Sequence, residues 1–136
     1  MFPYFDAMTI KKSVIHNKSK GCYEGFVNMG QNIVSDEDDT VATEALIFML
    51  SGLQSHWKYP IISYVLIDKI NADDLFCLIN SALQLALENN LKVRTVTCDG
   101  TSTNFKAMKL LGCKIGDSLD KIDGSFSFPG YDYELL

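Results

Sequence analysis

Residues 71–111 have the sequence NADDLFCLINSALQLALENNLKVRTVTCDGTSTNFKAMKLL, and this stretch decides the fold class. In its first half, apolar residues recur at intervals of three and four, the pattern of a helix with one buried face. Residues 92–98 are rich in β-branched types and predict a strand, and residues 102–111 predict a second helix that ends at Gly112. A helix, a strand, a short loop and another helix indicate a parallel α/β unit.

The two helices are expected to have defined ends and buried faces. Asn71 is placed to cap the first helix, expected over residues 71–90, and Asp74 lies where a carboxylate favours the exposed backbone amides. Asn89-Asn90 is expected to end this helix. Its predicted buried stripe is Leu75, Leu78, Ile79, Ala82, Leu83 and Ala86. The residues expected to point inward from the second helix are Phe105, Met108 and Leu111.

Strands are predicted before the first helix. Residues 45–53 and 60–68 are short apolar runs bounded by Gly or Pro, and they indicate a hairpin of buried strands. Residues 4–16 and 23–27 predict two further strands joined by a turn at residues 17–21. Antiparallel strands are therefore expected to precede the parallel unit.

The length of 136 residues fits one domain. The apolar pattern is lost after Gly112, so we divide the chain into a folded unit at residues 1–114 and an irregular tail at residues 115–136 that leads toward a remainder. The acidic run at residues 36–39 is expected to be a solvated loop.

Composition excludes several classes of function. The formal net charge is −5, the wrong sign for a protein whose own surface grips phosphate backbones. The most apolar stretch, residues 45–53, is far shorter than the roughly 20 residues that a membrane helix needs, so no membrane partner is expected. The four cysteines form no C-x-x-C pair, which indicates reduced thiols in an intracellular protein rather than a zinc site.

Three aspartates are candidates for chemistry. Asp99 follows a predicted parallel strand, where functional groups gather, although it could instead cap the next helix or its loop. Asp6 lies among apolar residues of the first strand, where a charge is costly unless it is paired or binds a metal; the alternative is an edge strand with Asp6 facing solvent. Asp68, just before a helix, is typical of a surface junction and is the weakest candidate.

If the first strand lies beside residues 92–98, Asp6 and Asp99 can face each other. Two carboxylates with Mg²⁺ or Mn²⁺ suit phosphodiester chemistry, because such ions activate the attacking oxygen and stabilise the leaving one. Sites of this kind usually hold a third carboxylate. None of the later acidic residues stands on a predicted helix that would deliver it: Asp117, Asp120, Asp123, Asp132 and Glu134.

Four blocks of the sequence, in this order, resemble P-element transposases and the THAP-domain-containing proteins derived from them. The blocks are FDAMTIKK (5–12), YEGFV (23–27), TEALIFMLSGLQSHWKYPIISYVL (43–66) and VTCDGTSTNFKAMKLLGC (96–113). The resemblance covers about residues 4–114. It implies an α/β, RNase H-like catalytic core of the DDE transposase and integrase type: a mixed sheet with three antiparallel strands, a parallel fourth strand and flanking helices.

The resemblance also implies roles for two residues. Asp6 aligns with the first catalytic carboxylate of the family and Asp99 with the second, so both are expected to bind Mg²⁺ or Mn²⁺. Ala7 replaces the glutamate that usually follows the first aspartate, and that glutamate is not counted among the catalytic acids.

In the family, the chain continues with a GTP-binding insertion and a late acidic residue, and it also carries a THAP finger and a coiled coil for DNA recognition and dimerisation. None of these is expected in residues 1–136. The resemblance thus implies that residues 1–136 are a partial, incomplete catalytic core, inactive by itself. The full-length parent is expected to be a nuclear transposase that acts on the DNA of transposon ends and self-associates through regions outside these residues. The alternatives are a domesticated, non-enzymatic module for protein or DNA contacts, and an α/β domain that binds an anion at Gly100–Thr103.

Overall fold

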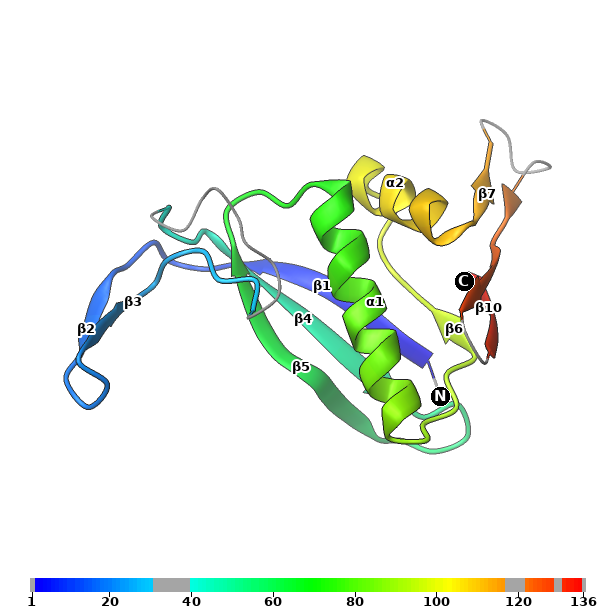
Figure 1. Cartoon of the computed structure of the whole chain (residues 1–136), viewed down its shortest axis with the longest axis horizontal. Helices are drawn as coiled ribbons and strands as arrows, with labels where there is room; N and C mark the ends of the chain where they lie inside the picture. The colour runs from blue at the N-terminus through cyan, green and yellow to red at the C-terminus, as the bar shows by residue number, and fades with distance from the viewer. Residues whose placement is uncertain (1, 31–39, 117–121, 129–130, 136) are drawn as a thin grey trace.

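Three antiparallel strands form the centre of the computed structural model, which describes residues 2–30, 40–116, 122–128 and 131–135. They are β1 (Phe2–Thr9), β4 (Glu44–Ser51) and β5 (Lys58–Ile67), in the order β1-β4-β5 (Figure 1). The predicted hairpin of buried strands is therefore confirmed, with a register irregularity at Phe48. The Phe5 and Phe48 rings, from paired positions of β1 and β4, lie 5.4 Å apart between centroids.

The parallel half of the sheet continues from the other edge of β1. β6 (Thr95–Val96) pairs in parallel with β10 (Tyr131–Leu135), which pairs antiparallel with β9 (Ser125–Phe128). A parallel bridge between Tyr4 and Thr97 joins the two halves; the Thr97 backbone N–H donates to the carbonyl of Pro3 over 3.0 Å. The strand order becomes β5-β4-β1-β6-β10-β9, a mixed α/β sheet as the sequence predicts.

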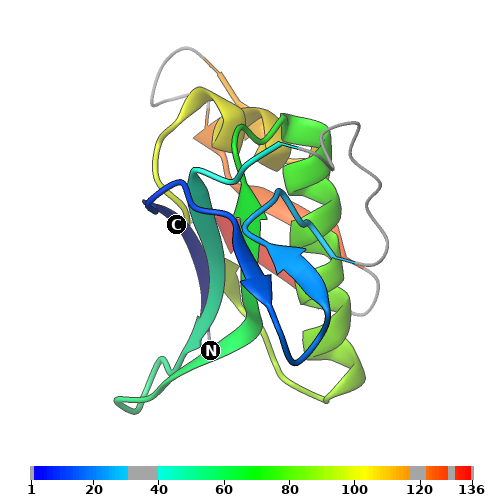
Figure 2. The same ribbon diagram turned by 90° about the vertical axis from the view of Figure 1, so that its left-hand side faces the viewer.

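Two helices pack against one face of this sheet (Figure 2). α1 (Ala72–Glu88) begins at Asn71, whose side chain accepts from the backbone N–H of Asp74 over 2.7 Å, and it ends at Asn89. α2 (Ser102–Leu111) begins at Thr101 and ends at Gly112, which adopts a left-handed φ of 113°. The predicted ends of both helices are confirmed.

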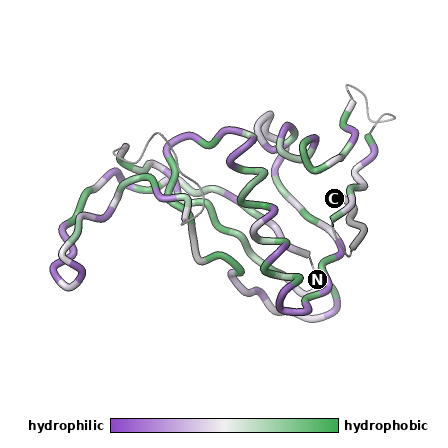
Figure 3. Tube along the Cα trace, in the orientation of Figure 1, coloured by the Kyte–Doolittle hydropathy of each residue, from purple (hydrophilic) through white to green (hydrophobic). Residues whose placement is uncertain are grey.

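The hydrophobic core lies between the helices and the sheet. All six residues of the predicted stripe of α1 are buried, and hydrophobic and hydrophilic segments alternate along this helix (Figure 3). On α2, Met108 is buried and Leu111 is half-buried, as predicted. Phe105 is 41% exposed, so the prediction that its side chain points inward is wrong. The face of α2 that turns inward carries Ala107 and Met108, and the Phe105 ring lies beside Gly100.

The first predicted strand is interrupted. β1 ends at Thr9, and the following segment forms a separate hairpin of β2 (Ile15–Asn17) and β3 (Cys22–Glu24), which projects from the sheet (Figure 1). The predicted turn at 17–21 is confirmed, because the Gly21 N–H donates to the carbonyl of Asn17 over 2.8 Å. The returning strand ends at Glu24 rather than at residue 27.

The prediction of an irregular tail is wrong for its described part. β7 (Lys114–Ile115) pairs with β8 (Ile122–Asp123), and β9 and β10 extend the main sheet. β9 alternates exposed serines with the buried Phe126 and half-buried Phe128, the period-two pattern of a sheet with one covered face. The domain boundary at residue 114 stays a prediction.

Some predicted features lie outside the described residues, namely the acidic run at 36–39 and the carboxylates Asp117 and Asp120. Neither described helix combines the length and hydrophobicity needed to cross a membrane.

Candidate active site

A cavity of about 540 Å³ opens near the amino ends of α1 and α2. Four carboxylates from four different strands or strand ends reach it, together with one lysine. The residues that line it are Phe5, Asp6, Ala7, Glu44, Leu46, Ile67, Asp68, Lys69, Ile70, Leu75, Asp99, Thr101, Thr103 and Asn104. The cavity is therefore strongly acidic and lies where β6 ends, the position at which functional groups gather in sheets of this type.

The sheet register brings Asp6 and Asp99 to the same level. Tyr4 of β1 and Thr97 form the parallel bridge, and each aspartate lies two residues beyond its bridge residue. Residues two apart in a strand lie on the same face, so both aspartates leave the sheet side by side. The prediction that the first strand lies beside residues 92–98 is confirmed at this bridge.

Asp6 is held by the pairing of β1 with β4, where it lies opposite Ile47. On the other side of β1, the bridge to Thr97 is at Tyr4, two residues before Asp6. The alternative of an edge position facing solvent is therefore not excluded by this bridge. The Asp6 side chain is exposed and borders the cavity, and its Oδ1 accepts from the Ala7 backbone N–H over 2.9 Å. Its other oxygen can accept a further ligand.

Asp99 is oriented by the first turn of α2. The side-chain Nδ2 of Asn104 donates to Asp99 Oδ1 and, over 3.3 Å, to the Asp99 carbonyl. The Thr101 N–H lies 3.4 Å from the same Oδ1. Thr101 caps α2, since its Oγ1 accepts from the Asn104 N–H, so Asp99 is not the helix cap and fixes the loop instead.

Asn104 is a residue of this site to which sequence reasoning gave no role. It belongs to the block VTCDGTSTNFKAMKLLGC that carries the family resemblance, but nothing in that block indicates its role. Because it lies five residues after Asp99, only the turn through Gly100 and Thr101 brings the two side chains together. No local periodicity predicts such a contact.

Two further carboxylates belong to the cavity. Asp68 is half-buried and accepts from the Thr43 hydroxyl over 2.8 Å, so it is part of the cavity wall rather than a simple surface junction. Glu44, the first residue of β4, was not predicted; its place at the end of an apolar run gave no signal of a site.

Cys98, next to Asp99, does not supply a reactive sulfur. Burial, and to a smaller extent the negative charge of Asp99, raise the pKa of the Cys98 thiol to about 11. The group is therefore a thiol at neutral pH, whereas metal ligation and nucleophilic attack need the thiolate. Oxygen atoms are the donors that this cavity offers.

The donor set fits a divalent magnesium-like ion. Mg²⁺ prefers oxygen ligands and is commonly held by one or two carboxylates, with water and substrate phosphates completing its shell. Asp6 and Asp99 provide such a pair. Among the described residues, no group of three or more His, Cys, Asp or Glu is placed to hold one metal ion, so the pair has no third carboxylate partner there.

Comparison with known proteins defines the class. Residues 4–112 match the family model described as "TNP-like, RNase H N-terminal domain". Since this match covers most of the chain, the chain belongs to that family of transposase-like RNase H domains.

The chain is also similar to two particular transposases. The human protein named DNA transposase THAP9 is 23% identical over 114 residues, which are 83% of this chain and 12% of that protein. The structure titled Drosophila P element transposase strand transfer complex matches with a TM-score of 0.65 and 16% identity, over 99% of this chain and 25% of that chain. The structural match supports the RNase H-like fold, and the chain spans only a small part of either relative.

Proposed function

We propose that the cavity is part of a metal-dependent phosphodiester active site of a P-element-like DNA transposase, with Asp6 and Asp99 as its two carboxylate ligands. The observation that supports this most is the parallel bridge at Tyr4 and Thr97, which puts the two aspartates on neighbouring strands at one cavity. DNA as substrate and a nuclear location are proposed on the basis of the named relatives.

Four residues of the cavity have a role in this proposal. Asp6 and Asp99 would hold Mg²⁺ or Mn²⁺, which when bound activates the attacking oxygen and stabilises the leaving oxygen of a phosphodiester. Asn104 fixes the Asp99 carboxylate through its side-chain N–H. Lys69, at the rim, offers a positive charge to a phosphate oxygen.

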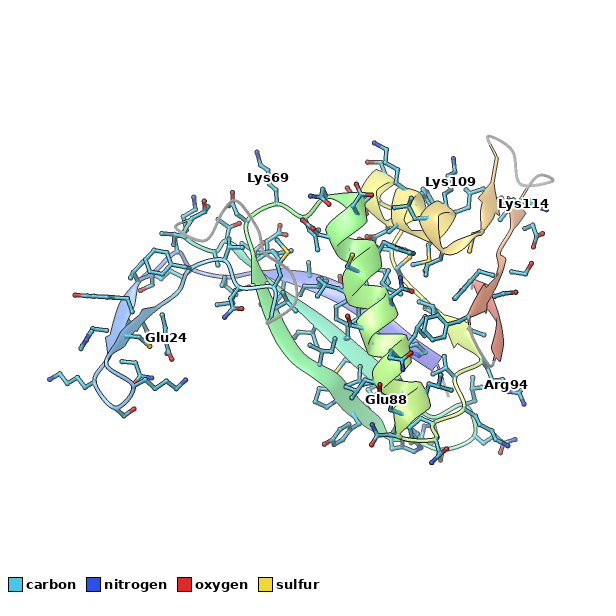
Figure 4. All side chains as sticks on the ribbon, in the orientation of Figure 1. Glu24, Lys69, Glu88, Arg94, Lys109 and Lys114 are labelled. Atoms are coloured by element: carbon cyan, nitrogen blue, oxygen red, sulfur yellow. The ribbon has the colours of Figure 1, made fainter. Side chains whose placement is uncertain are left out.

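Metal binding tests the proposal directly. Titration of Mn²⁺ into the full chain, followed by electron paramagnetic resonance, is compared for the unaltered protein, Asp6→Asn, Asp99→Asn and the matched control Glu88→Gln. Glu88 lies at the far end of α1 (Figure 4), and its replacement also removes one carboxylate. We expect each aspartate variant to lose at least about tenfold in affinity, equivalent to about 1.4 kcal/mol, and the control to bind normally. Normal binding by either aspartate variant would refute the proposal.

A second candidate function is a domesticated, non-enzymatic module for protein or DNA contacts. It is favoured by the lack, among the described residues, of a third ligand beside Asp6 and Asp99. It predicts that Asp6→Asn and Asp99→Asn leave the cellular role of the protein intact. Loss of that role in both variants, with the fold retained, would exclude it.

A further inference from the structure

Residues 10–25, which we name the basic arm, form a projection that the site described above does not use. The arm contains β2 and β3 and extends away from the sheet, with Glu24 labelled on it in Figure 4. It holds four lysines and a single carboxylate, a net charge of +3 in a chain whose net charge is −5. Positive charge is therefore concentrated on one projecting element.

Three of the four exposed lysines of the arm are available to contact a partner. Lys20 pairs with Glu24 over 2.9 Å. Lys11, Lys12 and Lys18 are exposed, and none of them forms an ion pair within the part of the chain that the structure describes. Tyr23, 66% exposed, lies against His16 with ring centroids 5.0 Å apart.

The base of the arm is anchored next to the acidic cavity. The Ile10 N–H donates to the Thr43 carbonyl over 2.8 Å, and the Ala42 N–H donates to the Gly25 carbonyl over 2.9 Å. Thr43 in turn donates its hydroxyl to Asp68 of the cavity wall. Both ends of the arm are thus tied to the segment that leads into β4.

A glycine fixes the direction of the arm. Gly25 has a φ of +117°, and a Cβ atom at this position would lie 2.0 Å from the carbonyl oxygen of Ser13. The two chain segments at the base therefore cross at a distance that only glycine allows. The arm leaves the sheet at a defined place.

We propose that the basic arm binds the phosphate backbone of duplex DNA beside the cavity. This inference rests on the proposed function, because a phosphodiester that enters the cavity meets four carboxylates and one lysine. A polyanion is repelled there unless nearby positive charge offsets the repulsion. Lysines that contact phosphates supply that attraction without reading sequence.

The reach of the arm suits this role. Lys11 lies five residues beyond Asp6, at most about 17 Å away at roughly 3.3 Å per residue. One turn of duplex DNA spans about 34 Å, so a duplex that has one phosphate at Asp6 and runs along the arm would reach Lys11 within about half a turn. Lys12 and Lys18 extend the same charged element outward.

The salt dependence of DNA binding tests the proposal. Affinity for a fluorescein-labelled 20-base-pair duplex is measured by anisotropy over a range of salt concentrations, with EDTA present so that no metal contributes. The unaltered chain is compared with the triple variant Lys11→Gln/Lys12→Gln/Lys18→Gln. The control, Lys106→Gln/Lys109→Gln/Lys114→Gln, removes equal charge from exposed lysines of α2 and β7; Figure 4 labels Lys109 and Lys114 on the side opposite the arm.

We expect the arm variant to bind at least tenfold more weakly at low salt. Its slope of log affinity against log salt is expected to fall by about 0.9 for each phosphate that the lysines no longer neutralise, and the control variant should stay near the unaltered protein. Equal losses in both variants, or no DNA binding by the unaltered chain, would overturn the proposal. Because EDTA is present, these outcomes are independent of the Mn²⁺ titration, which tests Asp6 and Asp99 alone.

Two native cysteines allow a test of position. Cys22 on β3 and Cys77 on α1 are both free and exposed. An iron–EDTA reagent is attached to Cys22 in a Cys77→Ser variant, and to Cys77 in a Cys22→Ser variant. Cleavage of bound duplex DNA from Cys22 and much weaker cleavage from Cys77 is the expected result. Cleavage from Cys77 alone, or from neither cysteine, would place the DNA away from the arm.

Discussion

Replacing Asn104 with alanine tests whether metal binding depends on the orientation of the Asp99 carboxylate, because the carboxylate itself stays in the protein. In the native site the Asn104 side chain donates to both the carboxylate and the carbonyl of Asp99. Asn104→Ala removes both donors and leaves the carboxylate in place. The carboxylate is then expected to lose its fixed orientation, because the only other described hydrogen bond to its Oδ1 comes from the Thr101 N–H at 3.4 Å.

The size of the effect follows from these hydrogen bonds. A hydrogen bond to a charged group contributes about 1.5–3 kcal/mol and a neutral one about 0.5–1.5 kcal/mol, and the exposed carboxylate of Asp99 puts both at the lower end. Alanine offsets up to about 0.7 kcal/mol through its better helix propensity. We therefore expect the unfolding free energy, measured by urea denaturation, to fall by about 1 kcal/mol.

Metal affinity should fall much more than stability does. Partners that orient a metal ligand typically account for about 10–100-fold in affinity, so Mn²⁺ binding by Asn104→Ala is expected to weaken by at least about tenfold. Lys106→Ala, an exposed change on the same helix, is the control. If Asn104→Ala binds Mn²⁺ like the unaltered protein while Asp99→Asn does not, Asn104 does not orient the ligand and the reasoning is wrong.

Four further outcomes are expected. Leu83→Ala, at a fully buried position of α1, should lower the unfolding free energy by about 2–5 kcal/mol in urea titration; a loss below about 1 kcal/mol would contradict the packing. Gly25→Ala should loosen the basic arm and speed its amide hydrogen exchange, because the new methyl group collides with Ser13; unchanged exchange would contradict a fixed base. Burial raises the pKa of Cys98 to about 11, so alkylation of the folded protein at pH 8 should modify Cys22 and spare Cys98. The same shift means that the folded state holds this proton more tightly, so stability should fall as the pH rises from about 9 toward 11; a flat profile there would contradict it.

The sequence predicted best where local pattern and tertiary packing agree. The stripe of α1 needs only a period of 3.6 and one covering sheet, and all of its six residues are buried as expected. The ends of α1 and α2 follow from the side chains of Asn71 and Thr101 and the left-handed Gly112. Asp6 was singled out because a charge among apolar strand residues needs an explanation, and Asp99 because it follows a predicted parallel strand.

Features that depend on distant partners were missed. β10 becomes a strand because β6 and β9 pair with it from both sides, and its own sequence carries little signal. Glu44 was not predicted, because it joins the cavity only when β4 and β5 pair; the same pairing brings Asp68, the weakest of the predicted candidates, into the cavity wall. The break between β1 and the arm depends on the crossing of Ser13 and Gly25, which no periodicity reveals.

The central claim is that Asp6 and Asp99 hold one divalent ion between them, and iron-directed cleavage of the backbone tests it most directly. The full chain is loaded with Fe²⁺ in place of Mg²⁺, treated with ascorbate and peroxide, and its fragments are sized by mass spectrometry. We predict two cuts, one near residue 6 and one near residue 99, both abolished by Asp6→Asn and both abolished by Asp99→Asn. A single cut, or two cuts that respond separately to the two variants, would show that the aspartates do not share an ion.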